Sequence, residues 1–269
     1  AVKGKLERYA EVRKMRGTSV GYATIPYAFT RVGIQFAPPL RPELLPSGVR
    51  PKRRLKLFGI PIPQGSGILI AHDPSIDTIR FSTWALAAPA LASGLRVKLG
   101  SFIHGVASIN DMLRECGGFV DAKKDNLYVE SYDASHLTIG EAEIMTYSSD
   151  LEFNPDVVIV EDVNMLLEFS ERSEYTSLIY RTLFRRSSRN ITTIHLFAST
   201  KDDAWNIPLA NYYDYVFYLS RAGDQLYLEP LRTWGEVRPL GSVPVPLRLG
   251  SRCQDALAAG LKLDQGSGP

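Results

Sequence analysis

The chain has 269 residues, of which 45% are apolar and 22% charged, a composition that is typical of a folded protein and excludes a disordered chain. The formal net charge is only +2, from 31 basic and 29 acidic side chains, so no strong basic field demands a nucleic-acid partner. The longest apolar stretch, 84–92, contains Pro89 and is far shorter than the ~20 residues of a membrane span. We therefore expect one large domain with an appendage and no membrane insertion.

The two cysteines, Cys116 and Cys253, are too few for a disulfide framework, and we expect them to be small core residues in a reducing cytosol. Neither has a Cys or His at zinc-binding spacing. Lys3 and Lys5 have no apolar run behind them, so no signal peptide is expected. These features predict a cytoplasmic protein without a metal site.

The N-terminal residues 1–37 resemble a segment near the other end of the chain. Residues 11–18 align with residues 229–236, and the same offset of 218 residues pairs Gly17 with Gly235 and Pro26 with Pro244. Each copy has the pattern of two strands around a glycine turn. We expect an N-terminal β-hairpin extension that duplicates a C-terminal hairpin, with chance similarity as the alternative. Residues 38–54 are predicted to form a proline-rich linker.

Residues 55–250 have the pattern of an α/β core. Continuous apolar runs, which are typical of parallel strands buried on both faces, occur at 68–71, 157–160, 191–197 and 215–219. Between them, helical spacing predicts helices over 105–116 and 171–187, and Pro89 should kink or split the first helix of the core. Residues 251–269 are expected to form a short helix and a flexible tail.

The strand at 68–71 leads into a loop and a helix, which is where a phosphate-binding loop of the form G-x-x-x-x-G-K-[ST] would lie. The four defining positions hold none of these residue types: they are His72, Asp77, Thr78 and Ile79. A lysine is lost and a carboxylate gained, which is repulsive toward a triphosphate. An ordinary strand–helix turn is the alternative interpretation.

The flanking residues resemble a known family. Gly59-Ile-Pro61, Gly65-Ser66 and 68–74 look like the entry to the phosphate loop of KaiC-like ATPases of the RecA superfamily; Asn154–Glu161 resembles the family's Walker B strand, and Lys14–Thr18 resembles a turn of its terminal hairpin. The resemblance implies a RecA-like, P-loop-type α/β fold: three layers, α/β/α, with a mainly parallel central sheet and a terminal β-hairpin.

The departures from the family decide the expected function. Thr78 and Ile79 replace the residues that hold phosphate and magnesium, Ile103 and His104 stand where a catalytic glutamate pair would lie, and Glu161, followed by Asp162, replaces the Walker B aspartate. Without residues that bind the phosphates, no nucleotide is positioned for attack by a water molecule that a base has activated. The resemblance therefore predicts a non-catalytic pseudo-ATPase subunit without a cofactor, acting as scaffold or regulator; an ATP-binding protein with an unorthodox loop is an alternative.

By the same resemblance, the N-terminal hairpin would place Lys14 and Arg16 in a neighbouring subunit's nucleotide site, and Arg232 would be the counterpart in the second copy. A solvent-exposed hairpin edge is the alternative. The expected partner is a second copy of the chain or a KaiC/RecA-like paralogue. We also expect Asp73, Asp77 and Glu161 to cluster where phosphates would bind, and to dock a neighbour's cation.

Two further sets of residues are candidates for binding. Arg181, Arg185 and Arg189 are spaced by four on the polar side of a predicted helix, with Arg186 adjacent; they are candidate contacts to a nucleic-acid backbone, as in a nucleic-acid-binding RecA paralogue, or a solvated helix end. His195 lies in an apolar strand and is expected to be a hydrogen-bonded core residue. His72 and His104, with Asp73 and Glu161, match no known metal-ligand spacing.

Overall fold

The computed structural model describes residues 8–11, 24–30, 33–36, 54–118, 124–233, 241, 243–248, 252–257 and 260–264. These residues form a central eight-stranded sheet and two small three-stranded sheets. The central sheet has the order β13-β12-β11-β6-β10-β9-β7-β8. Its strands are β6 (Gly67–His72), β7 (Val97–Ser101), β8 (Leu127–Ser131), β9 (Val157–Glu161), β10 (Thr192–Ala198), β11 (Tyr215–Ala222), β12 (Gln225–Arg232) and β13 (Val243–Arg248).

Six of these strands, β11, β6, β10, β9, β7 and β8, are paired in parallel, while β12 and β13 add an antiparallel edge. Every residue of β6 is buried, as expected for a strand that is covered on both faces. The prediction of a mainly parallel sheet from continuous apolar runs is confirmed.

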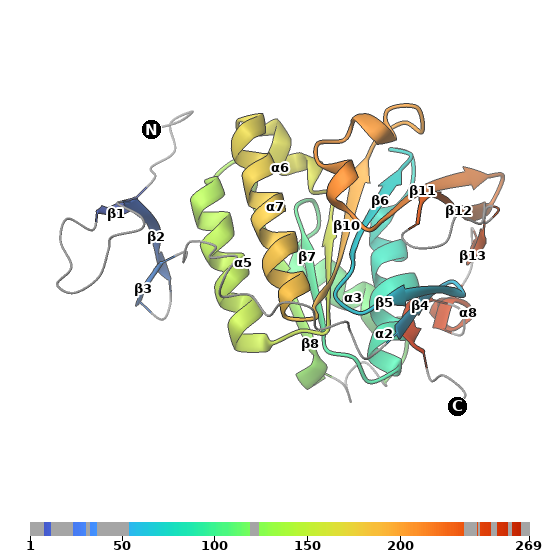
Figure 1. The fold of residues 1–269 in the computed structure, drawn as a ribbon. Helices are drawn as coiled ribbons and strands as arrows, with labels where there is room; N and C mark the ends of the chain where they lie inside the picture. Colours follow the sequence, from blue (N-terminus) through green and yellow to red (C-terminus); the bar gives the residue numbers. More distant parts are fainter. Residues whose placement is uncertain are drawn as a thin grey trace.

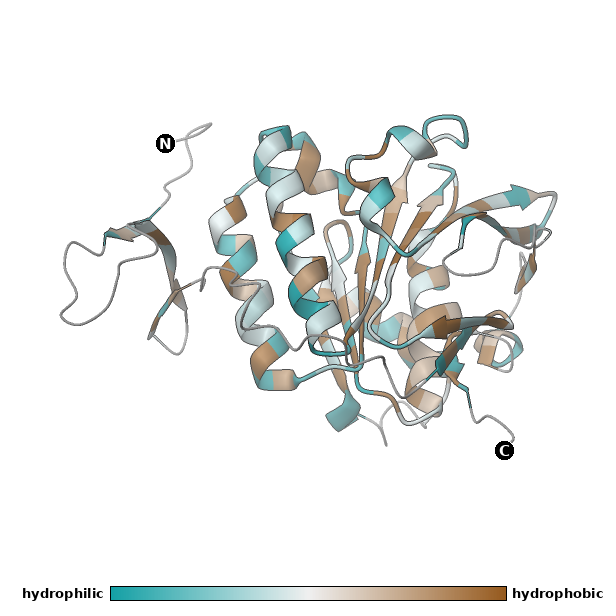
Figure 2. Cartoon of the chain, in the orientation of Figure 1, coloured by the Kyte–Doolittle hydropathy of each residue, from teal (hydrophilic) through white to brown (hydrophobic). Residues whose placement is uncertain are grey.

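Helices cover both faces of the central sheet (Figure 1). One face carries the helix that follows β6, which consists of α1 (Thr78–Arg80), a π-helical segment (Phe81–Ala87) and α2 (Ala88–Ala92), together with α3 (Val106–Arg114) and α8 (Cys253–Leu257). The other face carries α5 (Ile139–Phe153), α6 (Asn164–Glu168) and α7 (Arg172–Ser188). Three short 3₁₀ turns, Lys124–Asn126, Ala204–Asn206 and Ala210–Tyr212, lie in connections. Figure 2 shows the apolar residues concentrated on the sheet between these layers, so the chain is a three-layer α/β structure.

Pro89 lies in the first core helix, which continues through α2 to Ala92, and the predicted kink or split stays a prediction. Because proline has no backbone N–H, the usual α-helical donor to the carbonyl of Ala85 is missing, and the N–H of Leu261 donates to that carbonyl instead, at 3.0 Å. A side chain at Gly260 would clash with the Ala85 carbonyl oxygen and with Cγ of Pro89. The end of the chain therefore packs closely against the helix at its irregular point.

The C-terminal segment is more ordered than predicted. β14 (Lys262–Leu263) pairs with β4 (Arg54–Leu57), which also pairs with β5 (Ile60–Pro63). Asp264 forms an ion pair with Lys56 at 2.7 Å. The sequence analysis did not predict β14 between the short helix and the tail; Leu261 is buried and the strand completes a small sheet. The predicted tail lies outside the described part from residue 265 onward.

The two cysteines form a disulfide, which corrects the expectation of free thiols. Cys116, just after α3, and Cys253, at the start of α8, have Cα atoms 4.9 Å apart. Both are buried in the core. The bond closes a loop of 137 residues and ties the C-terminal segment to the layer that contains α3.

The N-terminal strands β1 (Tyr9–Glu11), β2 (Thr24–Thr30) and β3 (Gly33–Phe36) form a separate antiparallel sheet beside α5 (Figure 1). Arg8 lies 3.5 Å from Glu141 of α5. The pairing register of β1 and β2 places Tyr9 opposite Pro26, and β12 and β13 place Tyr227 opposite Pro244. The offset of 218 residues seen in the sequence therefore also relates the registers of the two hairpins. The linker at 38–54 lies outside the described residues except for Arg54.

Candidate functional site

The carboxyl ends of strands β6, β7 and β9 bring polar side chains together. His72 ends β6, Ser101 ends β7 and Glu161 ends β9. In open α/β sheets, ligands bind beyond the carboxyl ends of the parallel strands, so this is where a phosphate site would lie. All three side chains are at most 2% exposed.

The loop after β6 uses its own backbone N–H groups. The N–H of Ser75 donates to the Asp73 carboxylate at 2.8 Å, and the N–H of Ile76 donates to the Asp73 carbonyl at 3.0 Å. The N–H of Asp73 donates to the carbonyl of Leu219 at 3.2 Å. A phosphate-binding loop needs such N–H groups directed at the anion. Here they close a tight turn, and the bonds from Ser75 hold the pKa of Asp73 below its usual value.

Thr78 and Ile79 occupy the positions of the Lys and of the Ser or Thr in the motif, and both side chains are buried. The Thr78 hydroxyl donates a 3.1 Å hydrogen bond to the carboxylate of Asp162, and both residues are buried. Ile79 is part of the hydrophobic core. Nε2 of His72 lies 3.3 Å from the other carboxylate oxygen of Asp162. These contacts engage the side chains at the motif positions with one another and with the core.

Glu161 is fully buried and accepts a hydrogen bond from the hydroxyl of Ser82, in the π-helical segment. Burial raises the pKa of Glu161 above its ordinary value, against the hydrogen bonds from Ser82 and Ser101. The carboxyl group thus acts as a structural link between β9 and the first core helix. It has no exposed surface at which to accept a proton from a water.

The predicted cluster of acidic side chains is not formed. Asp77 is exposed and lies 3.8 Å from Arg80, and Asp73 belongs to the turn, whereas Glu161 is completely buried. Glu161 therefore cannot share a surface with Asp77, because it ends a central strand under the helix. The proposed docking of a neighbour's cation on these three carboxylates is withdrawn.

The positions of the expected catalytic glutamates lie just beyond β7. The side chain of Ile103 is 48% exposed, and the N–H groups of Ile103 and His104 both bond to the Ser101 hydroxyl, at 3.2 and 2.9 Å. His104 is near enough to Glu161 to lower its pKa slightly. Among the described residues no group of three His, Cys, Asp or Glu side chains is arranged to hold a metal ion.

Of the three hairpin residues predicted to reach a neighbouring subunit's nucleotide site, Arg232 alone lies among the described residues. Lys14 and Arg16 lie outside the described residues. Arg232, their predicted counterpart, is exposed at the end of β12 and donates to the Asn211 carbonyl at 2.7 Å.

The arginines of α7 serve the fold more than the surface. Arg186 is 2% exposed and binds Asp150 at 2.6 Å, so it is not available for the predicted contact with a nucleic-acid backbone. Arg181 and Arg185 share the carboxylate of Glu143, each at 2.7 Å. Of the four arginines predicted as a binding set, Arg189, just after α7, is the exposed one, and it donates to the Asn154 side chain at 3.1 Å. The α5 carboxylates explain this: they lie opposite α7 and neutralise its cations.

The sequence analysis did not predict a buried ionic network that the structure contains. Lys98, on β7, is 1% exposed and forms ion pairs with Glu130 at 2.8 Å and Asp150 at 2.9 Å. Burial acts to raise the pKa of Asp150, but the charges of Arg186 and Lys98 outweigh it and hold the pKa below its usual value. The one signal was a lysine in the middle of an apolar strand.

His195 is buried on β10, as expected, with Nδ1 2.7 Å from the hydroxyl of Tyr213. Burial lowers its pKa to about 3, so the imidazole is neutral at physiological pH.

No family model and no curated protein matches the chain. In the described part of the chain, none of the helices has the length and apolar character needed to cross a membrane.

Proposed function

We propose that the chain is a non-catalytic subunit, similar in fold to KaiC-like ATPases of the RecA superfamily, that acts as scaffold or regulator in an assembly with itself or with a related active ATPase. The observation that carries this proposal is the turn after β6, in which the Asp73 side chain and carbonyl take up the N–H groups of Ser75 and Ile76. A loop that bonds these two N–H groups to itself offers fewer donors to phosphate oxygens.

The contents of the site support the same conclusion. Thr78 is bonded to Asp162, and Ser82 to Glu161. Opening the site for a nucleotide would break both bonds and leave two buried carboxylates without their hydroxyl donors, which costs on the order of 1–3 kcal/mol for each. A triphosphate would also be repelled by the carboxylates.

The duplicated hairpin supports a role in assembly. The small N-terminal sheet exposes large apolar side chains, which isolated proteins rarely gather on one element: Tyr9, Phe29, Ile34 and Phe36. Its only contact with α5 that buries hydrophobic side chains from both sides, among the described residues, joins Ala28 to Ile144. A sheet with so small a core on its own subunit is suited to contribute to a larger interface.

The proposal is tested by equilibrium binding of ATP and ADP with magnesium, measured by calorimetry on the full chain. We expect no heat of binding at millimolar nucleotide. A dissociation constant in the micromolar range would contradict the pseudo-ATPase proposal and favour an ATP-binding protein with an unorthodox loop.

The hairpin is tested separately with the Lys14→Ala, Arg16→Ala double variant, and with Lys3→Ala, Lys5→Ala as a charge-matched control. We expect the first pair to weaken self-association, measured by analytical ultracentrifugation, and the control pair to leave it unchanged. Equal behaviour of the two variants would remove the hairpin from the proposal.

The ion pairs of Arg181, Arg185 and Arg186 do not favour nucleic-acid binding as the main function.

A further inference from the structure

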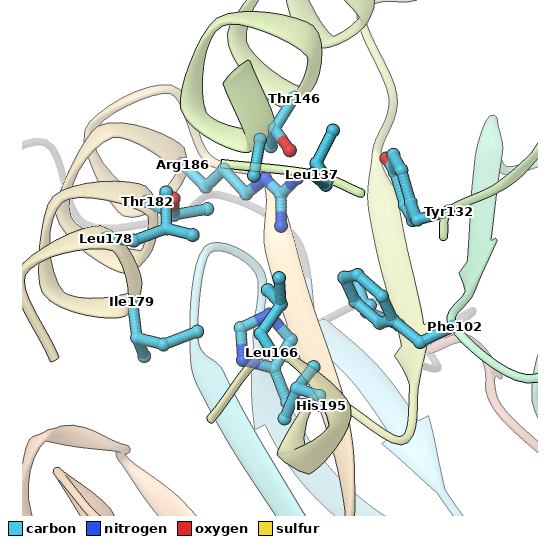
Figure 3. Close-up of a pocket in the computed structure, with 13 residues that line it drawn as sticks. Phe102, Tyr132, Leu137, Thr146, Leu166, Leu178, Ile179, Thr182, Arg186 and His195 are labelled. Atoms are coloured by element: carbon cyan, nitrogen blue, oxygen red, sulfur yellow. The ribbon is translucent and has the colours of Figure 1, made fainter. Parts of the chain in front are cut away.

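A small cavity of about 40 Å³ lies between the central sheet and the layer of α5, α6 and α7 (Figure 3). It is away from the turn after β6 and has no part in the proposed function. Its wall is mostly apolar, with Phe102 and Tyr132 stacked on one side, their ring centroids 5.0 Å apart. The cavity is larger than the ~10–15 Å³ that one water molecule requires.

Two polar groups on α7 that line this cavity have no hydrogen-bond partner among the described residues. They are Nη1 of Arg186 and the hydroxyl of Thr182, on residues 2% and 6% exposed. Figure 3 shows the Arg186 guanidinium extending from α7 into the cavity, on the side opposite His195. Nε and Nη2 of the same guanidinium bind Asp150, so the group is fixed in place and only Nη1 is left to bind a ligand.

The described side chains that line the cavity include a cation but no carboxylate. None of the described residues that line it carries a carboxylate, whereas Arg186 contributes a full positive charge. Asp150 pairs with both Arg186 and Lys98, and Lys98 also pairs with Glu130, so the carboxylates that balance the two cations lie outside the lining while Arg186 is part of it. His195 is neutral because burial lowers its pKa to about 3. A donor-rich, carboxylate-free cavity next to a buried cation favours an anion over a cation.

We propose that this cavity binds a small monovalent anion of the size of chloride, held by Nη1 of Arg186 and the hydroxyl of Thr182. The cavity, about 40 Å³, suits a small compact anion better than one with a carbon chain. Apolar side chains complete the coordination shell, as suits a weakly hydrated halide. The bound ion would give these two donors of α7, unpartnered among the described residues, an acceptor and so add to the stability of this layer.

The direct test is a crystal of the full chain soaked in sodium bromide, with data collected at the bromine absorption edge. We expect an anomalous peak within contact distance of Arg186 Nη1 and Thr182 Oγ1. Density for water alone in the cavity, in a crystal that shows bromide elsewhere, would overturn the proposal.

A second measurement uses thermal unfolding in sodium chloride and in sodium gluconate of equal ionic strength, because gluconate is too large for the cavity. At chloride ten times above its dissociation constant we expect the melting temperature to rise by roughly 2–3 °C. Thr182→Val should reduce this difference, and Thr193→Val, which removes another buried hydroxyl without a partner in the described structure but outside the cavity, should retain it. Equal melting temperatures of the unmodified chain in the two salts, or an equal loss in both variants, would count against the site.

Discussion

The hydroxyl of Thr78 donates a 3.1 Å hydrogen bond to the carboxylate of Asp162, beneath the turn that follows β6. Thr78 stands where a phosphate-binding loop would have its lysine, and Asp162 follows the strand that would hold a magnesium-binding aspartate. The two residues bind each other, so the positions that would grip a nucleotide instead join the first core helix to β9.

Removing this bond should destabilise the fold. We expect Thr78→Val to lower the free energy of unfolding by about 1–3 kcal/mol, because it keeps the side-chain volume but leaves the buried Asp162 oxygen without its donor. Urea unfolding followed by fluorescence measures the change. Thr176→Val is the matched control, since the Thr176 hydroxyl bonds at the surface of α7, and its effect should stay within about 0.5 kcal/mol.

The buried carboxyl of Glu161 gives a pH-dependent prediction. Its pKa is raised in the folded state, so its contribution to stability is complete below the unfolded pKa of 4.5 and is lost as the pH rises through the folded value. We expect Glu161→Gln to gain stability relative to the unmodified chain as the pH increases from 4 to 8, by about 1.4 kcal/mol for each unit of pKa elevation. Parallel pH profiles of the two proteins would show that the carboxyl ionises freely in the fold.

The disulfide should be a large contributor to stability. Reduction, or the Cys116→Ser, Cys253→Ser double variant, is expected to cost about 2–5 kcal/mol, because the bond closes a long loop. Alkylation under denaturing conditions followed by intact mass measurement should find no free thiol before reduction and two after it. Two alkylated cysteines without reductant would contradict the bond between α3 and α8.

The close approach of the C-terminal segment to the first core helix is tested at Gly260. We expect Gly260→Ala to destabilise the chain by about 1–3 kcal/mol, since its Cβ would overlap the Ala85 carbonyl and Pro89. Gly118→Ala is the control, because a Cβ there meets no atom within 4 Å. Hydrogen exchange at the N–H of Leu261 should also become faster in the first variant alone.

Much of the fold follows from local patterns. The apolar run at 68–71 became β6, the helical stripe at 171–187 became α7 with Tyr175 and Leu178 buried, and Pro89 leaves the Ala85 carbonyl without its usual α-helical donor. Such features depend on the periodicity of neighbouring residues and on covalent geometry, so they can be predicted without knowing the tertiary structure.

The errors all concern contacts between distant segments. Nothing in the sequence indicates that Cys116 and Cys253 meet, because their pairing depends on where α8 docks. Arg186 looked like part of a polar face, but Asp150 of α5 draws it into the core. Asp77 and Glu161 were expected to be close because a family loop would bring them together; the turn at Asp73 directs the chain differently.

The most direct test of the central claim is the native mass of the full chain, recorded with and without millimolar Mg-ATP. The turn at Asp73 and the bond between Thr78 and Asp162 predict that the mass of each subunit and the size of the assembly are the same in both spectra. A mass increase of one ATP per subunit, or an assembly that forms only with ATP, would contradict the account of a filled, non-catalytic site.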